Sequence, residues 1–237
     1  MKIVGIIQAR LGSTRLPRKV LAEILGRPML AVLLDRLRDA KTVNEFVIAT
    51  SDQPQDRAIA ELADAEGFAC FRGSEDDVLD RFYQAAKLHQ ADVVVRLTGD
   101  NPLMDAELVD WSVGQFREAK PPVDYAAISH DAGFPAGIGG EIFTMKALAR
   151  AWQDSSGPAA REHVTAFIYQ HPELFRCAKL GCEPGWPHLR ATVDTPEDLE
   201  LVRRIFTELG RTRFPWREFP ALLERHPDWL ALNAAAS

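Results

Sequence analysis

Short apolar runs alternate with amphipathic segments through the first half of this chain. The runs have the length of buried strands and are bounded by turn residues; they cover residues 2–7, 45–50, 68–71 and 92–97. The segments that follow them have apolar residues at helical spacing, and helices are expected over residues 28–40, 54–66, 76–89 and from Asp105 onward. Because parallel strands need a crossover helix between them, this order predicts an α/β fold with a mostly parallel sheet covered on both faces.

The pattern is less regular in the second half. Strands are predicted at residues 123–127 and 189–193, and helices at 158–171 and 196–209. A Gly-rich stretch, residues 129–140, is typical of a loop that contacts a ligand, so residues 120–145 are a candidate lid or acceptor-binding segment. Aromatic and aliphatic residues from Phe214 onward predict a docking segment at 211–237, whose last four residues are expected to fray. All 237 residues are interpreted as one domain.

Composition excludes several classes of protein. Of the 237 residues, 46% are hydrophobic and 26% are charged, and the net charge is -6. No apolar run approaches the ~20 residues that span a bilayer, and Gln8 and Arg10 interrupt the N-terminal apolar segment, unlike a signal peptide. The sequence therefore predicts a cytoplasmic protein that binds neither membranes nor nucleic acid.

The cysteines give little sign of a metal or disulfide framework. Cys70, Cys177 and Cys182 are an odd number without Cys-x-x-Cys spacing. A zinc site built from Cys177, Cys182 and His188 is an alternative, but buried or isolated thiols are the favoured interpretation.

One cationic segment stands out against the acidic background. Residues 10–19 carry four Lys or Arg and no acid, and residues 1–40 hold eight such cations against three acids. The segment follows the first predicted strand, where Gly12 permits a tight turn and Pro17 disfavours a helix at the preceding residue. Open α/β sheets bind ligands at this end of their strands, and guanidinium groups with turn N–H groups can surround phosphate oxygens. We interpret the segment as a triphosphate-binding loop rather than a solvated basic loop.

Two common phosphate-loop patterns are disfavoured. The Walker pattern needs Gly-Lys followed by Ser or Thr, whereas Lys19 lies between Arg18 and Val20. The dinucleotide fingerprint needs three spaced glycines after the strand, and only Gly12 is present. The loop therefore indicates another kind of nucleotide-binding protein.

Two acidic residues follow predicted strands at the same sheet edge as this loop. Asp100 follows the strand at the centre of the chain, and Asp194 follows the last predicted strand. Magnesium commonly binds one or two carboxylates together with phosphate oxygens, so both are candidate metal ligands. Asp100 can also be a turn residue. Alternatively, Asp194 precedes a helix whose cap is Thr195 and whose first residue is Pro196. The negative charge of Asp198 would then interact favourably with the N-terminal end of the helix dipole.

The loop and the residues behind it resemble the cytidylyltransferases that activate sugars for surface polysaccharides: I-I-Q-A-R-L-G-S-T-R-L-P-R-K-V-L, then G-R-P-M-L. This group contains the acylneuraminate and 3-deoxy-manno-octulosonate cytidylyltransferases, and the branch named for spore coat polysaccharide biosynthesis is the most similar. Further matching segments follow in order to about residue 206, namely F-R-G-S, D-V-L-D-R-F, V-R-L-T-G-D-N-P, R-E-H-V and V-D-T-P-E-D. The chain departs from that branch at Gly99 and Asn101, where alanine and cysteine are usual, and at Arg18, where glycine is frequent.

The resemblance implies a three-layer, Rossmann-like nucleotidyltransferase fold that is similar to GT-A glycosyltransferases. It implies that CTP and a sugar give a CMP-sugar and pyrophosphate, with Mg²⁺ as cofactor. Arg15 and Lys19 would be catalytic, and Asp100 and Asp194 would bind the metal, with Asp100 also beside the nucleotide. The other nucleotide contacts would come from Ala9, Arg10, Leu11, Gly12, Gly73, Ser74 and Arg81. Arg81 alternatively lies on a helix surface.

The sugar site and the exact reaction are less well indicated. Glu141, after the Gly-rich stretch, and His163 are candidate substrate-binding residues; the alternatives are a strand-edge acid and a helix-surface histidine. A glycosyltransferase of the GT-A type stays open, although its usual Asp-x-Asp motif is replaced here by Asp100-Asn101-Pro102. A non-catalytic nucleotide-binding protein also stays open, and the family likeness allows a homodimer. Neither the sugar nor a general base is indicated.

Overall fold

The chain folds into strands, α-helices and short 3₁₀ helices within residues 1–183 and 185–233, the part that the computed structural model describes. The strands are β1 Ile3–Gln8, β2 Glu23–Ile24, β3 Arg27–Pro28, β4 Glu45–Ser51, β5 Ala69–Gly73, β6 Val93–Thr98, β7 Tyr125–Ile128, β8 Glu141–Thr144 and β9 Cys177–Leu180. The α-helices are α1 Met29–Leu37, α2 Arg57–Ala65, α3 Val78–Leu88, α4 Ala106–Glu118, α5 Met145–Asp154, α6 Pro158–Glu162, α7 Ala166–Gln170, α8 Pro196–Leu209 and α9 Glu218–Arg225. The 3₁₀ helices are η1 Lys19–Leu21, η2 Pro54–Asp56, η3 His130–Ala132 and η4 Pro227–Ala231.

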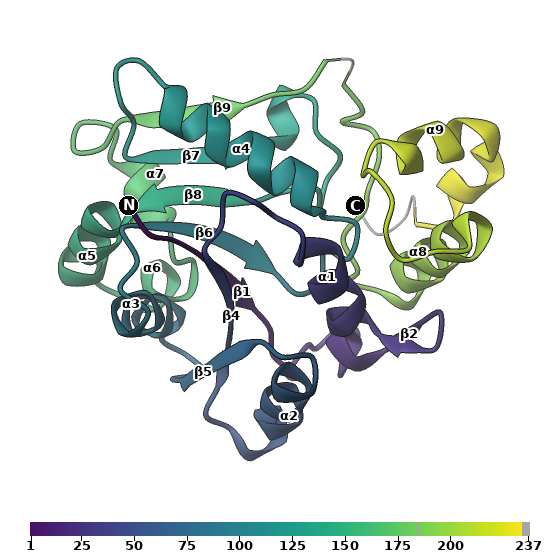
Figure 1. Ribbon diagram of the computed structural model, residues 1–237, viewed down its shortest axis with the longest axis horizontal. Helices are drawn as coiled ribbons and strands as arrows, with labels where there is room; N and C mark the ends of the chain where they lie inside the picture. Colours follow the sequence, from purple (N-terminus) through teal and green to yellow (C-terminus); the bar gives the residue numbers. More distant parts are fainter. Residues whose placement is uncertain (184, 234–237) are drawn as a thin grey trace.

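A seven-stranded sheet forms the centre of the molecule, in the order β5-β4-β1-β6-β8-β7-β9 (Figure 1). Neighbouring strands are parallel except where β8 pairs with β6 and with β7. The predicted α/β fold with a mostly parallel, mixed sheet is therefore confirmed. β2 and β3 form a separate antiparallel hairpin between the cationic loop and α1.

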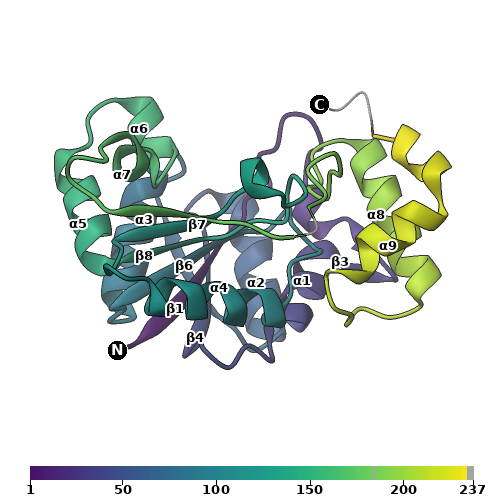
Figure 2. The ribbon, with the colours of Figure 1, turned by 90° about the horizontal axis from the view of Figure 1, so that it is seen from above.

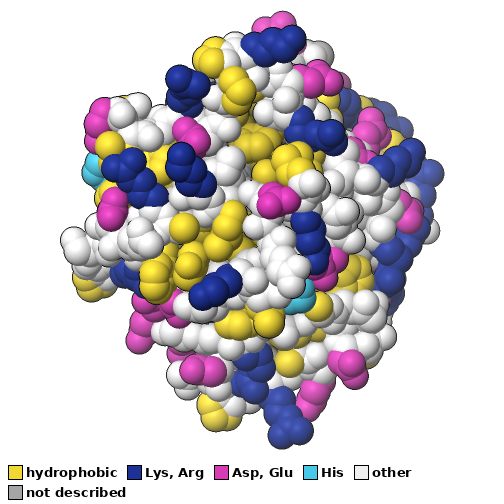
Figure 3. All heavy atoms as spheres, turned by 60° about the vertical axis from the view of Figure 1, so that its left-hand side comes forward, with side chains coloured by type: hydrophobic (Ala, Val, Ile, Leu, Met, Phe, Trp, Pro, Cys, Tyr) yellow, Lys and Arg dark blue, Asp and Glu magenta, His cyan; other side chains and the backbone are white. Residues whose placement is uncertain are grey.

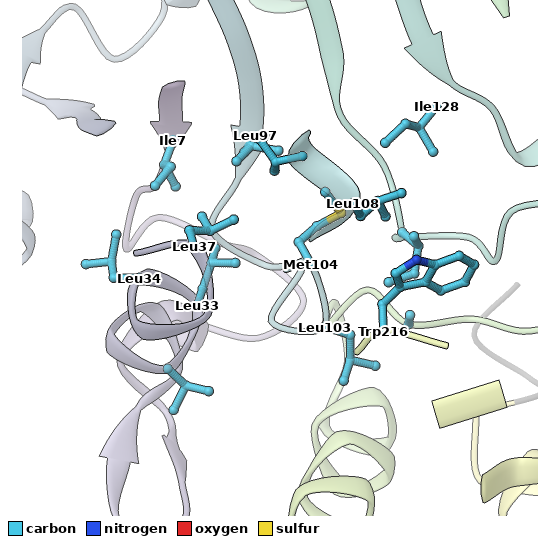
Figure 4. Packing of buried hydrophobic residues seen from close by; sticks show 14 of the residues in the cluster. Ile7, Leu33, Leu34, Leu37, Leu97, Leu103, Met104, Leu108, Ile128 and Trp216 are labelled. Carbon is cyan, nitrogen blue, oxygen red and sulfur yellow. The ribbon is translucent and has the colours of Figure 1, made fainter. Parts of the chain in front are cut away.

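Apolar layers cover both faces of the sheet. In β1, Ile7 belongs to the layer that contains α1, α4 and α8, whereas the adjacent Ile6 belongs to the layer under α3 and α5. Figure 4 shows Leu33 and Leu37 of α1 beside Ile7 and Leu97, at the ends of the two central strands. Because both faces are buried, these strands read in the sequence as continuous apolar runs rather than as alternating ones.

Helix α8 begins and ends as the sequence predicts. Thr195 is its cap and accepts a hydrogen bond from the Asp198 N–H, and the Asp198 carboxylate accepts one in return from the Thr195 N–H. Pro196 occupies the first turn, and Gly210 ends the helix in the left-handed conformation. The capping interpretation of Asp198 is therefore confirmed, and it places Asp194 immediately before a rigid helix end.

The strand predicted at 189–193 was wrong. Leu189, Ala191 and Val193 are buried in alternation, which produces the strand-like pattern. The segment nevertheless pairs only briefly with the Gly-rich loop: Ala136 donates to the Leu189 carbonyl and accepts from the Ala191 N–H. Packing against the Gly-rich loop thus gives the same alternating burial as a strand within a sheet.

The predicted helix over 158–171 was also wrong in one respect, because it is divided into α6 and α7. The backbone leaves the helical conformation at His163, and Val164 has a φ of 23°. The edge strand β9 was not predicted, because three of its four residues are at least partly exposed and give no apolar run. β8 escaped prediction for another reason: it is only four residues long and directly follows the Gly-rich stretch.

Two further segments were singled out by the sequence. In the candidate lid, Phe134 and Ile138 are buried in the core and anchor the loop, so a lid role stays a prediction. In the C-terminal segment, Trp216, Phe219 and Leu222 are buried, and α8 and α9 lie together at one end of the molecule (Figures 1 and 2). The expected fraying of residues 234–237 lies outside the described residues.

The opposite end of the molecule exposes apolar surface. Figure 3 shows hydrophobic side chains among charged ones on the side of α3, α5, α6 and α7. Leu88 and Tyr169 are among the exposed large side chains. Among the described helices, none combines the length and apolar character that crossing a bilayer requires. A homodimer stays a prediction.

Candidate active site

The cationic loop leaves β1 at Gln8 and is fixed to the end of β4 by a buried acid. The Asp56 carboxylate, which is fully buried, accepts hydrogen bonds from the Leu11 N–H (2.8 Å) and from the Ser51 hydroxyl. The Leu11 carbonyl accepts from the N–H groups of Ser13 and Arg18. The backbone N–H and carbonyl of Leu11 therefore both have partners within the chain, and its contact with a nucleotide stays a prediction. Sequence reasoning missed Asp56, because nothing local marks it as a partner of residue 11.

Lys19 brings together the two acids that the sequence singled out. Its Nζ donates to Asp100 Oδ2 at 2.7 Å and to Asp194 Oδ1 at 2.8 Å, although these residues lie 81 and 175 positions away. It also donates to the Val193 carbonyl at 2.9 Å, and only 9% of Lys19 is exposed. β6 lies next to β1 and delivers Asp100, and the Val193 N–H donates to the Asp100 carbonyl. The predicted meeting of loop and acids at one sheet edge is therefore present.

Asp194 is the most strongly compensated charge at this edge. Arg15 lies 3.0 Å from Asp194 Oδ1, and Arg190 donates to Oδ2 at 2.9 Å. Burial alone would raise the pKa of Asp194, but the hydrogen bond and charge of Lys19, with Arg15 and Arg190, hold it below its ordinary value. Arg190 also binds the capping residue Asp198, so it links the carboxylate to the start of α8. The sequence analysis did not single out Arg190.

A pocket of about 280 Å³, which we call the phosphate pocket after its predicted ligand, opens between the loop and these acids. Its walls include most of the residues expected to hold a triphosphate and a metal, namely Ala9, Arg10, Gly12, Arg15, Lys19, Asp100 and Asp194. Gln8 and Thr98, at the ends of the two central strands, complete its floor. Three cations therefore face two acids, and the excess positive charge suits a polyanion.

Gly73, Ser74 and Arg81 are not among the residues that line this pocket, although the charge of Arg10 acts on Arg81. Arg81 is fully buried and donates to the Ser74 carbonyl at 2.5 Å, so the helix-surface interpretation was wrong. Burial, followed by the nearby positive charge of Arg10, lowers the pKa of Arg81. Among the described residues its Nε and one terminal nitrogen have no hydrogen-bond partner. Two buried donors thus lie next to the cationic loop.

Glu141 lies in the middle of the sheet, at the start of β8. It pairs with Arg96 of β6, and its Oε1 accepts from the Tyr125 hydroxyl at 2.5 Å and from the Thr165 hydroxyl at 2.6 Å. Burial would raise the pKa of Glu141, but the charge of Arg96 and the hydroxyls of Thr165 and Tyr125 hold it below its ordinary value. The strand-edge interpretation was therefore wrong, because neighbours flank β8 on both sides. A signal for Arg96 was present, since it is the one charge in an otherwise apolar strand.

His163 is not part of this arrangement. It is exposed at the end of α6 and lines a separate pocket between α6 and α7 with Pro158 and Tyr169. The structure instead brings Thr165, two positions later, to Glu141. His163 is therefore an exposed histidine outside the phosphate pocket, and its predicted contact with the substrate stays a prediction.

The candidate metal ligands at this pocket are a pair of acids. Within residues 1–183 and 185–233, no three His, Cys, Asp or Glu side chains are grouped to hold an ion. This excludes the zinc alternative, and all three cysteines are free thiols. Asp100 and Asp194 offer two hard oxygen ligands at the phosphate pocket, a number that suits an ion sharing phosphate and water ligands.

Comparisons with known proteins identify the family. A cytidylyltransferase family model matches residues 4–212. An uncharacterized protein of Methanocaldococcus jannaschii is 39% identical over 99% of this chain and 95% of its own length. The spore coat polysaccharide biosynthesis protein SpsF of Bacillus subtilis is 37% identical over 95% of both chains.

Solved structures agree with this assignment. A cytidylyltransferase from Leptospira borgpetersenii superposes with a TM-score of 0.93 at 30% identity, covering 97% of each chain. A CMP:2-keto-3-deoxy-manno-octonic acid synthetase, solved in complex with CTP, has a TM-score of 0.65 and covers 88% of this chain and 99% of its own. At 23% identity the latter likeness concerns the fold alone. From its sequence match, its fold and its relatives, this chain belongs to the cytidylyltransferase family.

Proposed function

We propose that the protein transfers CMP from CTP to a sugar hydroxyl, for the synthesis of a surface polysaccharide or glycoconjugate. The observation that carries this proposal is the contact of Lys19 with both Asp100 and Asp194 at the mouth of the cationic loop. The relatives add support, since one is named for spore coat polysaccharide biosynthesis and another was solved with CTP.

The chain's own cations would position the triphosphate and stabilise the charge that develops on it. Arg10, Arg15 and Lys19 face the phosphate pocket, and cytosine would lie beside Arg10, near Ser74 and the unpartnered nitrogens of Arg81. The sugar oxygen forms a bond to the α-phosphorus, the bond from that phosphorus to the β-phosphate bridging oxygen breaks, and the hydroxyl proton is released. Arg15 and Lys19 neutralise the negative charge that grows on the departing pyrophosphate.

A divalent cation fits the same site, and Mg²⁺ is the proposed one. Asp100 and Asp194 would hold it, and they supply the hard oxygen ligands that Mg²⁺ prefers. When bound, Mg²⁺ supplies charge neutralisation on the phosphate oxygens. Lys19 contributes before any ion binds, because its ammonium group holds the two carboxylates on one side of the pocket.

The experiment is a two-step assay on the full chain. Calorimetry with CTP, UTP, ATP and GTP in the presence of Mg²⁺ first measures nucleotide binding and base preference. Pyrophosphate release from CTP is then measured over a panel of sugars, and the CMP-sugar is identified by mass spectrometry. CTP binding with acceptor-dependent pyrophosphate release supports the proposal. CTP binding without turnover on any acceptor would indicate a nucleotide-binding protein, and cleavage of a supplied nucleotide sugar would indicate a glycosyltransferase.

A further inference from the structure

A second pocket adjoins the phosphate pocket and has a different lining. It measures about 260 Å³ and lies between β6, the end of β7 and the Gly-rich loop. Thr98 lines both pockets, and Gln8, in the floor of the first, accepts a hydrogen bond from Arg96 in the wall of the second. Two other pockets in the described part of the chain, beside Arg36 and beside His163, share no lining residue with the phosphate pocket. The second pocket is therefore placed to hold a molecule that reacts with the bound nucleotide.

The charges of this second pocket balance. Arg96 and Glu141 are the two charged residues in its described lining, and they form an ion pair. The remaining lining is polar but uncharged or apolar, with Thr98 and Asn101 on one side and Gly139 and Gly140 on the other. An anionic group entering here would meet a cation that is already neutralised and a carboxylate that repels it.

Two residues in the lining of this pocket carry hydrogen-bonding atoms without a partner in the described part of the chain. Asn101 is about nine-tenths buried, and its Oδ1 has no hydrogen-bond partner in residues 1–183 and 185–233. The Arg96 Nε is likewise buried and unpartnered within the same residues. A buried polar atom without a partner costs free energy, so a ligand that donates and accepts hydrogen bonds gains affinity by satisfying it. Hydroxyl groups both donate and accept.

We infer that the second pocket binds an uncharged, polyhydroxylated part of the acceptor, and that the acceptor carries no carboxylate there. The inference rests on the proposed function, since it names the substrate class of the same reaction. It separates this chain from enzymes named for 3-deoxy-manno-octulosonate, whose acceptor is a carboxylic acid. Asn101 acts as a specificity-determining residue, and Glu141 sets the charge of the pocket by neutralising Arg96.

The first test compares neutral and acidic probes on the protein with CTP bound. Saturation-transfer NMR and calorimetry measure binding of glucose, mannose, galactose and N-acetylglucosamine, and of 3-deoxy-manno-octulosonate, with Mg²⁺ present. At least one neutral sugar is expected to bind about tenfold or more tightly than the acid, on the scale of one or two hydrogen bonds. Tighter binding of the acid, or no binding of any neutral sugar while CTP binds, overturns the inference and leaves the proposed function standing.

Two variants then test which residues are responsible. Asn101→Ala should weaken binding of the preferred neutral sugar about tenfold while the Kd for CTP is unchanged. Glu141→Gln keeps the shape and a carbonyl acceptor for Thr165 but leaves Arg96 uncompensated, so it should raise affinity for 3-deoxy-manno-octulosonate. Circular dichroism and thermal melting establish that each variant folds, and Asn101→Ser serves as a conservative second variant if the alanine form does not. Unchanged probe preference in both folded variants overturns the inference, whereas failure of the wild type to bind CTP overturns the proposed function as well.

Discussion

The two neighbouring pockets share strand β6 but differ in their balance of charge. In the phosphate pocket, Arg10, Arg15 and Lys19 face two acids, whereas in the second pocket Arg96 faces a single acid that neutralises it. Thr98 lines both, so the difference does not come from distance. It comes from the number of charges, because three cations outnumber two acids in the phosphate pocket, whereas Arg96 is matched by Glu141 in the second. The two pockets therefore suit ligands of different charge, although they share Thr98.

Breaking the ion pair of Arg96 and Glu141 should have the largest effect, which is on the stability of the fold. Glu141→Ala leaves the Arg96 guanidinium without its counter-ion and removes the acceptor of the Tyr125 and Thr165 hydroxyls. The free energy of unfolding, measured by urea denaturation, should fall by about 3–5 kcal/mol. The exposed Glu173→Ala is the control and should change it by about 0.5 kcal/mol or less. A loss as small as that of the control would mean that the pair contributes little to the fold.

Removing the central cation of the phosphate pocket comes next. Lys19→Ala removes the group that contacts Asp100 and Asp194, and turnover should fall by roughly two orders of magnitude or more, as for loss of one charge-stabilising donor. Pyrophosphate release from CTP at saturating substrate measures the effect. Lys146→Ala, at an exposed position on α5, is the matched control and should keep wild-type turnover. Near-normal activity of the Lys19 variant would contradict its catalytic assignment.

A smaller effect is expected from loosening the loop without touching its cations. Asp56→Ala leaves the Leu11 N–H without its acceptor, so the loop loses its attachment to β4. CTP affinity measured by calorimetry should fall about tenfold, and stability by about 1–3 kcal/mol. The exposed Asp64→Ala on α2 should change neither quantity. Unaltered CTP affinity in a folded Asp56 variant would show that other contacts hold the loop.

The smallest expected effect concerns acid stability. The pKa of Asp194 is lower in the folded chain than its ordinary value of 3.8, because burial is outweighed by Lys19, Arg15 and Arg190. Its ion pairs therefore stabilise the fold fully above about pH 4, and this contribution is lost as pH falls through the folded pKa. Urea denaturation between pH 2 and 5 should show a shallower pH dependence for Asp194→Asn than for the wild type. The exposed Asp131→Asn should keep the wild-type slope, and an identical slope for both variants would refute the assignment.

Local pattern predicted the first half of the fold well. The strands that became β1, β4 and β6 are buried on both faces, so their apolar runs carry the whole signal. The second half was harder, because β9 is an exposed edge strand and residues 189–193 are buried against a loop. In both cases the apolar pattern reflects only whether a side chain is buried or exposed, and it does not identify the element that packs against it.

In the candidate site, too, the sequence predicted some positions and not others. Lys19 and Asp100 were predicted together, because the segments that follow parallel strands lie at one edge of a sheet. Asp194 was predicted there from a strand at 189–193 that the structure does not contain, and the start of α8 places it instead. The surroundings of His163 and Arg81 were not predicted, because a sequence shows neither which face of a helix is covered nor where the chain turns. Those questions depend on packing between distant segments.

The sequence by itself determined the class of fold and the cationic character of the phosphate loop, since both follow from residue spacing and from local charge. Tertiary structure alone decided which cations and acids meet. Arg96 is neutralised by Glu141, 45 residues away, while Lys19 lies between two acids that follow it by 81 and 175 positions. Electrostatic energy depends on distance in space rather than along the chain, so the binding chemistry of each pocket was settled only by folding.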